Sequence, residues 1–429
     1  MRHLFWVALL ITGLSMRVYA EETLSPAPVE DRFRSLEKRL ENLEQPDAVR
    51  EPAEFVCPDG TLYDGARGCP EGGIALERAS FRELKFSRRE SVAEKIAGAV
   101  AQSQRLKLGG SARGILQGAI GTDDDDQLFA GGALDLYFFS APLSQSLLFI
   151  DLESIGGRGP DEVIGSLSRL NRAADTPDVT DDVKIREAWL LQQFWQDRLH
   201  LIGGKIDLTN YFDQNGAAND ETIAFLNASL VNNPLLAQPV NGPGAVILFN
   251  PKGGLGARLG MQSSDGSSRN FAQKVYAIAE VNYHFPMQTL PGNYRLWGRT
   301  GRRPDDLSVE RWGAGISFDQ MLPAQTALFA RYAVGRTDGE GDHDAAGSIG
   351  WVVYAPFRER ARDHAGLGFS RLSTERGTEK IIEGYYHFFV SPLFSLIGNV
   401  QWLLEGPNQT TGGENDHLVI PGIRGTVHF

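Results

Sequence analysis

Residues 105–117 read Arg-Leu-Lys-Leu-Gly-Gly-Ser-Ala-Arg-Gly-Ile-Leu-Gln, and polar and apolar side chains alternate along them. Leu106 and Leu116 share one parity, whereas Lys107 and Arg113 share the other. Successive side chains of a β-strand point to opposite faces, so this period of two predicts a strand with one apolar and one polar face. Such a strand separates two different environments.

The same alternation continues to the end of the chain, most clearly in residues 275–282, 311–318 and 325–332. Counting these runs gives about sixteen strands, and the connections between them alternate between short and long. An even number of amphipathic strands is typical of a transmembrane antiparallel β-barrel, in which the apolar face meets lipid and the polar face lines the lumen. The strands of a soluble sandwich or propeller also alternate between polar and apolar residues, so the two ends of the chain are needed as further evidence for a membrane barrel.

The N-terminus has the pattern of a secretory signal peptide over residues 1–20. Arg2 and His3 precede an apolar run, and Val18-Tyr19-Ala20 supplies a small-residue cleavage site. No stretch approaches the ~20 apolar residues that a membrane-spanning helix needs. We therefore expect residues 104–429 to form an outer-membrane β-barrel of a Gram-negative bacterium.

Residues 21–103 differ from the barrel region because they are charged and helical in pattern. Five apolar residues recur at spacings of four and three, which places them on one stripe of a helix: Val29, Phe33, Leu36, Leu40 and Leu43. We expect a periplasmic segment that forms either a short oligomeric coiled coil or a single amphipathic helix on another surface. Such a segment offers contact with periplasmic partners or peptidoglycan.

Cys57 and Cys69 bracket a turn-rich loop in this segment. In an exported protein such a pair predicts a disulfide. A metal site would need two more ligands, and neither a CxxC motif nor a nearby pair of histidines provides them.

Composition and motifs limit the other function classes. A formal net charge of −12 argues against nucleic acid as a partner. Glu383 and His387 share a parity but stand about 13 Å apart on a strand at ~3.3 Å per residue, so they do not form an acid–base pair. The glycine-rich run 109–114 lacks the Lys-Ser/Thr of a phosphate-binding loop. We therefore expect no enzymatic activity and no cofactor.

Three motifs resemble the carbohydrate-selective porin family. They are Ile-Arg-Glu-Ala-Trp-Leu at 185–190, Gly-Gly-Lys-Ile-Asp at 203–207 and Glu-Gly-Tyr-Tyr-His-Phe at 383–388. The resemblance covers residues 105–429 and implies a sixteen-stranded homotrimeric barrel in outer-membrane lipids that passes mono- and oligosaccharides. It also implies that Phe429, which ends the last alternating strand, is an assembly signal for the barrel assembly machinery. A short coiled coil before the barrel is similar to the arrangement in sucrose porins, but this one is much shorter.

The polar faces of the expected strands supply the candidates for the lumen. A sugar offers hydroxyl groups and apolar C–H faces, so a sugar channel needs charged and amide side chains interleaved with aromatic rings. Charges of both signs cancel much of each other's field, which keeps neutral solutes competitive with anions. Alternation assigns to the lumen Arg113, Asp135, Glu153, Arg258, Glu280, Arg295, Trp297, Arg299, Arg311, Arg331, Glu383 and Arg424, and the family resemblance adds Glu187 and Trp189.

The roles of these residues remain open on the sequence. Each arginine–carboxylate pair either contacts solute or stiffens the wall, and Trp297 either stacks on sugars or turns toward lipid if the strand register slips by one. Residues 208–243 predict a long loop with a helical turn near 222–230, which either folds inward to narrow the pore or contacts neighbouring subunits outside.

Three functions are compatible with this sequence. The first is a carbohydrate-selective porin, and the second is a general or anion-preferring diffusion porin. The third is a structural tether of the envelope, in which the barrel is only an anchor.

Overall fold

A computed structural model describes residues 55–56, 62–63, 74–75 and most of 107–429. Within the last range it leaves out 122–126, 144, 174–182, 196–197, 252–253, 270, 288–289, 304–305, 338–343, 358–359, 361, 392 and 408–416. The signal peptide expected at 1–20 and the helical stripe of residues 29–43 lie outside the described residues. Cys57 and Cys69 also lie outside them, so these three expectations stay predictions.

The chain divides into two compact units, one of Met1–Phe55 with Leu62–Glu77 and one of Val56–Thr61 with Arg78–Phe429. Three two-residue strands, β1 (Phe55–Val56), β2 (Leu62–Tyr63) and β3 (Ile74–Ala75), form a small sheet in the order β2-β1-β3. The sequence pattern did not predict these strands. None of the described helices has the length and apolar character needed to cross a membrane.

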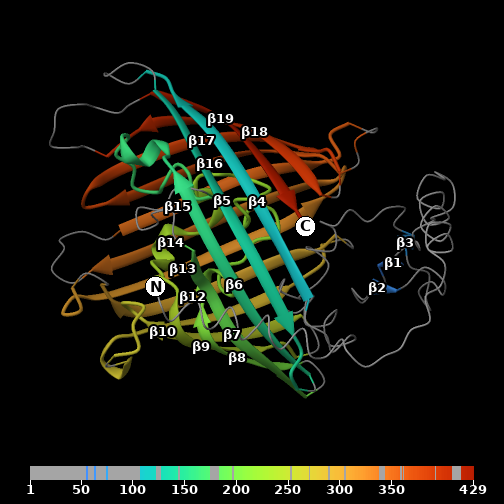
Figure 1. Cartoon of the computed structure of the whole chain (residues 1–429), viewed down its shortest axis with the longest axis vertical. Helices are drawn as coiled ribbons and strands as arrows, with labels where there is room; N and C mark the ends of the chain where they lie inside the picture. The colour runs from blue at the N-terminus through green and yellow to red at the C-terminus, as the bar shows by residue number, and fades with distance from the viewer. Residues whose placement is uncertain are drawn as a thin grey trace, which may run out of the picture. The chain divides into compact units, whose positions relative to one another are not determined.

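Sixteen antiparallel strands of the described residues close into a barrel (Figure 1). Each strand pairs with the next along the chain, and the last pairs with the first. The predicted sixteen-stranded fold is therefore confirmed. The strands are β4 (Lys107–Ala119), β5 (Gln127–Ser140), β6 (Ser146–Gly157), β7 (Lys184–Phe194), β8 (Leu199–Ile206), β9 (Gly242–Phe249), β10 (Leu255–Ser263), β11 (Val275–His284), β12 (Gly292–Arg302), β13 (Glu310–Leu322), β14 (Thr326–Thr337), β15 (Asp344–Tyr354), β16 (His364–Thr374), β17 (Gly377–Phe389), β18 (Phe394–Glu405) and β19 (Leu418–His428).

Residues that alternate along each strand lie in turn on the outer and the inner face of the barrel. Leu296 and Ile316 point outward and are 59% and 55% exposed, whereas their inward neighbours Trp297 and Ser317 are 2% and 4% exposed. An apolar outer surface of this kind belongs in lipid, which places the barrel in an outer membrane. The outward pair Tyr294 and Phe318 stacks with ring centroids 6.2 Å apart, as in the aromatic belts at membrane–water interfaces.

The two ends of the barrel differ in their connections. We call the end where β4 begins and β19 ends the terminus end, and the opposite end the loop end. Connections at the terminus end include the short turns 141–145 and 390–393, whereas the long connections 158–183 and 207–241 leave from the loop end. The expected alternation has an exception at the loop end, since β16 and β17 are joined by residues 375–376 alone.

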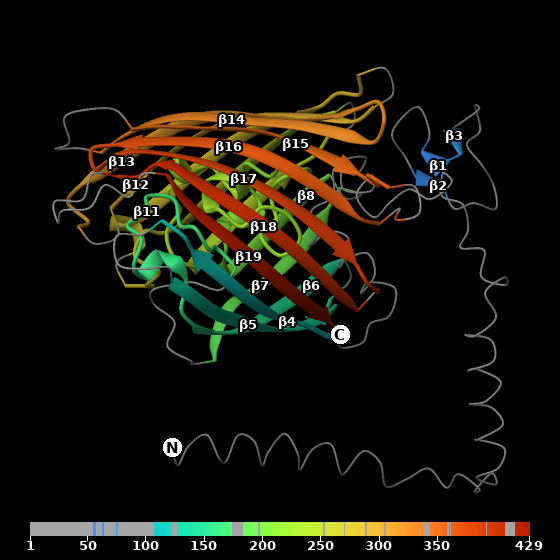
Figure 2. The same ribbon diagram turned by 90° about the horizontal axis from the view of Figure 1, so that it is seen from above.

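Of the two long connections, residues 158–173 and 207–241 pack against the interior wall (Figure 2). We call residues 207–241 the inward segment. It contains η2 (Leu208–Asn210), α5 (Ala228–Val231) and η3 (Pro234–Leu236), and α5 lies at the end of the region predicted to hold a helical turn. Each of these turns begins at an Asx cap, formed by Asp207, Asn227 or Asn233, whose side-chain oxygen accepts a backbone N–H two residues later.

Candidate pore constriction

Three arginines of the wall hold the main chain of the inward segment. A guanidinium group donates several hydrogen bonds in fixed directions, so it can replace the ladder partners that loop carbonyls lack. The donors and acceptors are Arg299 Nε to Leu235 O at 2.9 Å, Arg331 to Ala218 O at 2.8 Å and to Leu230 O at 2.9 Å, and Arg424 Nη2 to Ala224 O at 2.8 Å. These arginines are almost fully buried.

Wall carboxylates bind the N–H groups of the same segment. Glu383 accepts hydrogen bonds from the backbone of Leu226 at 2.7 Å and Asn227 at 2.9 Å. Glu280 accepts one from the backbone of Asp213 at 2.6 Å. The segment is therefore fixed through both its donors and its acceptors, from strands on several sides of the barrel.

Two aromatic residues on the inner face of the barrel are also covered by this segment. Trp297 is 2% exposed, and its Nε1 donates to Asp213 at 3.3 Å. Tyr276 is likewise buried, and its hydroxyl donates to Leu236 O at 2.7 Å. These rings fill the core between the wall and the segment and present no open face to the lumen.

A group of charged side chains lies on β4 to β7 and on the two long connections, and part of it, including Arg186 and Glu153, remains partly exposed. Arg186 lies at a β-bulge, because Asp151 pairs with Glu187 while the next residue, Leu152, pairs with Ile185. This extra residue sends its side chain inward, where it is 25% exposed. Bulges commonly re-aim a side chain in this way.

Arg186 faces three carboxylates. Its guanidinium nitrogens lie 3.6 Å from Asp151, 3.9 Å from Glu153 and 3.4 Å from Asp207. Arg113 lies beside them, 3.0 Å from Asp135 and 4.0 Å from Glu153. From the two inward-folded connections, Arg172 and Glu221 add a pair at 4.0 Å. We call these eight residues the charged constriction.

The sequence candidates thus fall into separate groups in the structure. Arg113, Asp135 and Glu153 are part of the charged constriction, and Glu187 and Trp189 lie next to it, joined by a hydrogen bond from Trp189 Nε1 at 3.0 Å. Two cross-strand pairs lie in the wall, and Glu280 of the first pair also binds the inward segment. The pairs are Arg258 with Glu280 at 3.7 Å and Arg295 with Asp319 at 2.7 Å, and Arg311 lies near the loop end of β13.

Asp151 has the same strand parity as the predicted Glu153, whereas the other four residues of the constriction were not predicted to line the lumen. Arg186 was missed because its bulge breaks the alternation that identified the others. Arg172, Asp207 and Glu221 belong to connections, where no strand parity applies. An Asp followed two residues later by Thr, as at 207–209, is a capping signal but does not reveal which way the loop folds.

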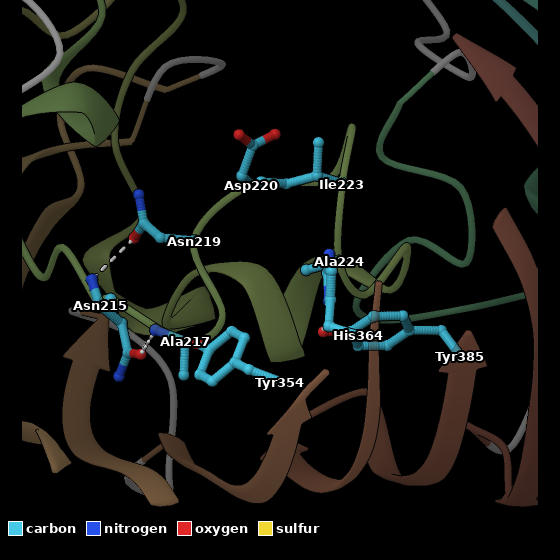
Figure 3. A pocket seen from close by; sticks show the side chains of 10 residues that line it. Asn215, Ala217, Asn219, Asp220, Ile223, Ala224, Tyr354, His364 and Tyr385 are labelled. Carbon is cyan, nitrogen blue, oxygen red and sulfur yellow. Dashed lines mark hydrogen bonds between the residues drawn. The ribbon is translucent and has the colours of Figure 1, made fainter. Parts of the chain in front are cut away.

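A small cavity lies where residues 215–224 meet the wall (Figure 3). Tyr354, His364 and Tyr385 line its wall side, and Asn215 caps the facing turn by accepting the Ala217 N–H at 2.9 Å. Its volume of about 20 Å³ holds a single water molecule and no sugar. This cavity is therefore not a solute site.

A closed barrel with an apolar outer face and charges of both signs inside has the architecture of a porin-type channel. Residues 281–429 match the family model described as "Carbohydrate-selective porin, OprB family". The predicted resemblance to this family is thereby confirmed for this part of the chain. The family match and the fold favour a location in the outer membrane.

Solved structures with the same fold include porins. The high-pH structure of Pseudomonas putida OprB has a TM-score of 0.64 and 14% identity, over 76% of this chain and 95% of that one. The low-pH structure of the same protein has a TM-score of 0.53 and 15% identity, over 79% of this chain and 98% of that one. A loop L8 deletion mutant of OmpT from Vibrio cholerae has a TM-score of 0.50 and 10% identity, over 76% of this chain and 99% of that one. At these identities the likeness concerns the fold.

One curated relative is an uncharacterized protein from Aquifex aeolicus (strain VF5). It is 32% identical over 87 residues, which make up 20% of this chain. The match spans 28% of that protein's length.

Proposed function

We propose that this protein is a passive porin selective for mono- and oligosaccharides. The observation that carries the proposal is the position of Arg186 in the lumen, facing Asp151, Glu153 and Asp207. A sugar hydroxyl both donates and accepts, so it can bridge the guanidinium and a carboxylate at once. Neither chloride nor an alkali-metal cation can bind both groups in this way.

The mixed charges also argue against a channel built for anions. Every cation of the charged constriction has a carboxylate within 4.0 Å. These carboxylates cancel much of the positive potential that would concentrate phosphate or chloride. Neutral solutes therefore compete well for the passage.

The experiment is planar-bilayer recording from the purified protein in KCl, titrated with glucose and with linear glucose oligosaccharides. Concentration-dependent block of the ion current, together with a reversal potential near zero in a KCl gradient, is the expected result. Strong anion selectivity without block by sugar would instead identify a general diffusion porin. Absence of any channel, combined with loss of envelope integrity in a deletion strain, would identify a tether.

The assembly that we propose is a homotrimer in outer-membrane lipids, inserted by the barrel assembly machinery. Residues 21–103 would lie in the periplasm and contact peptidoglycan or another periplasmic partner. Support comes from the family resemblance and from the amphipathic stripe in the sequence. Native mass spectrometry of detergent-extracted full-length protein measures the oligomeric state, and a monomer would overturn this part of the proposal.

A further inference from the structure

Three aromatic side chains of the lumen wall lie in mutual contact and are only half-buried. Tyr137 and Phe139 come from β5 and Phe149 from β6. The ring of Phe149 lies 6.1 Å from that of Tyr137 and 5.0 Å from that of Phe139, measured between centroids. Trp189 of β7 extends the group on the far side of Phe149 at 4.9 Å. We call these four rings the aromatic patch.

The exposed faces of the patch point into the lumen. Tyr137 and Phe139 share their parity on β5 with Asp135, which is fully buried inside the barrel, whereas Leu134 has the opposite parity and is 40% exposed on the outer face. Phe149 shares its parity with the buried, inward Leu147. The solvent that reaches these rings is therefore the water of the passage.

The patch begins where the charged constriction ends. Asp135, Tyr137 and Phe139 are successive inward positions of β5, each about 7 Å further toward the terminus end at ~3.3 Å per residue. On β6, Asp151 pairs with Tyr137 across the sheet, and Phe149 is the next inward residue toward the same end. A solute that leaves the charged residues in this direction meets the aromatic faces next.

These rings differ from the interior rings that the inward segment covers. Tyr276 and Trp297 are each 2% exposed and donate hydrogen bonds to the segment. Tyr137, Phe139 and Phe149 keep partly open faces, although Phe139 and Phe149 also pack at their edges against the buried core. An apolar surface beside a few fixed polar groups is the usual composition of a small-molecule site.

We propose that the aromatic patch is a second sugar subsite, in which the apolar C–H face of a pyranose ring stacks on Tyr137 and Phe149. The hydroxyls at the edge of that ring then reach the polar groups of the constriction one layer away. This inference rests on the proposed function and adds to it the class of ligand held at this place. Because constriction and patch are adjacent, a linear oligosaccharide occupies both at once and gains from the second site by proximity.

The test uses leucine substitutions, which remove the aromatic face and keep most of the apolar volume that supports the core. The double variant Tyr137→Leu/Phe149→Leu is compared with Phe249→Leu, which removes a ring from the outer face. Block of the ion current is titrated with glucose and with a linear glucose trisaccharide. Conductance in KCl alone and heat modifiability on gels establish that each variant forms a normal channel.

The Kd for block by the trisaccharide should rise about five- to tenfold in the double variant, the loss expected for a pair of ring contacts. The Kd for block by glucose should also rise in the double variant, and both Kd values should be unchanged in Phe249→Leu. Tyr137→Leu, which lies outside the core cluster, should repeat the effect in part.

Unchanged sugar block in a double variant with normal conductance overturns the subsite and leaves the proposed function intact. A wild-type channel that no sugar blocks overturns both. An equal rise in Kd for Phe249→Leu would also overturn the subsite, because that ring lies outside the lumen.

Discussion

Nε of Arg331 lies 3.0 Å from Oδ2 of Asp213, and both side chains are completely buried between β14 and the inward segment. The same guanidinium group donates to the carbonyls of Ala218 and Leu230. One wall residue thus joins two distant points of the segment and neutralises its buried carboxylate. The segment makes no ladder hydrogen bonds with the barrel strands over most of its length, so such contacts determine its position.

Arg331→Met should release the inward segment while the barrel stays closed. Leaving Asp213 as an unpaired buried charge costs about 3–5 kcal/mol. Since the strand ladder is untouched, this cost should appear as faster hydrogen exchange across residues 207–241 and as larger, noisier conductance. The double variant Asp213→Asn/Arg331→Met removes both charges and should recover part of the protection. Unchanged exchange in the single variant would show that the ion pair does not fix the segment.

Trp297→Ala should lower stability and leave sugar affinity unchanged. The indole packs so closely over Gly315 that a Cβ there would lie 2.4 Å from a ring carbon, and Nε1 is bonded to Asp213. Emptying such a site costs about 3–5 kcal/mol in buried cores. Thermal denaturation and current block by sugar, measured on the same preparations, separate the two effects. Weaker sugar block at unchanged stability would instead support a stacking role for Trp297, and Tyr294→Ala on the outer face is the matched control.

Arg186→Gln should shift ion selectivity toward cations and weaken sugar block. The substitution leaves Asp151, Glu153 and Asp207 without the guanidinium that faces all three, so the local potential becomes more negative. The reversal potential in a KCl gradient measures this change. Arg336→Gln removes the same charge from the outer face of β14 and should leave the reversal potential at the wild-type value. Equal shifts in both variants would mean that Arg186 does not lie at the constriction.

The loop between β10 and β11 offers a test by pH. The Lys274 ammonium, followed by the Ser263 hydroxyl and the Ser267 N–H, holds the pKa of Asp265 well below its usual range. Because folding lowers this pKa, the ionised carboxylate stabilises the folded loop above about pH 4, where a free Asp is ionised. This stabilisation is lost as the pH falls toward the pKa of the folded state. NMR titration of the labelled Asp265 carboxyl should therefore give a midpoint below about 4. Lys274→Met should raise that midpoint, whereas Lys380→Met, in a different ion pair, should not.

Strand parity predicted the barrel well because lipid and lumen impose opposite demands on alternate residues. The side of Trp297 and Arg299 followed from the same pattern. Their contacts did not, because parity reveals which face a residue occupies and not whether a loop will cover it. The arginines predicted to line the lumen therefore include several, such as Arg424, that donate a hydrogen bond to a loop carbonyl. Nothing in the sequence distinguished the partly exposed rings of Tyr137 and Phe149 from the buried ones, because their exposure depends on which part of the wall the inward segment covers.

The last prediction concerns Phe429, which closes the seam between β19 and β4. Its backbone N–H donates to Gly110 O at 3.1 Å, and its carbonyl accepts the Gly110 N–H at 2.9 Å. The ring covers Gly110 so closely that a Cβ there would lie 2.6 Å from a ring carbon. Deleting Phe429 should sharply reduce heat-modifiable protein in the outer membrane, because β19 loses these seam contacts and because the family resemblance implies an assembly signal at this residue.

Two further measurements separate seam closure from recognition by the assembly machinery. Gly110→Val keeps Phe429 but blocks the position of its ring, and the new Cβ would also lie 2.7 Å from the Asp135 carbonyl oxygen of β5, so this variant disturbs the pairing of β4 and leaves the last residue in place. If Phe429 acts as the signal, the deletion variant should refold into lipid vesicles, where no machinery is present, about as well as the wild type. A shared defect of both variants in vesicles would assign the role of Phe429 to barrel closure. Unchanged outer-membrane yield after the deletion would exclude both roles, because neither the seam nor the signal would then require the terminal ring.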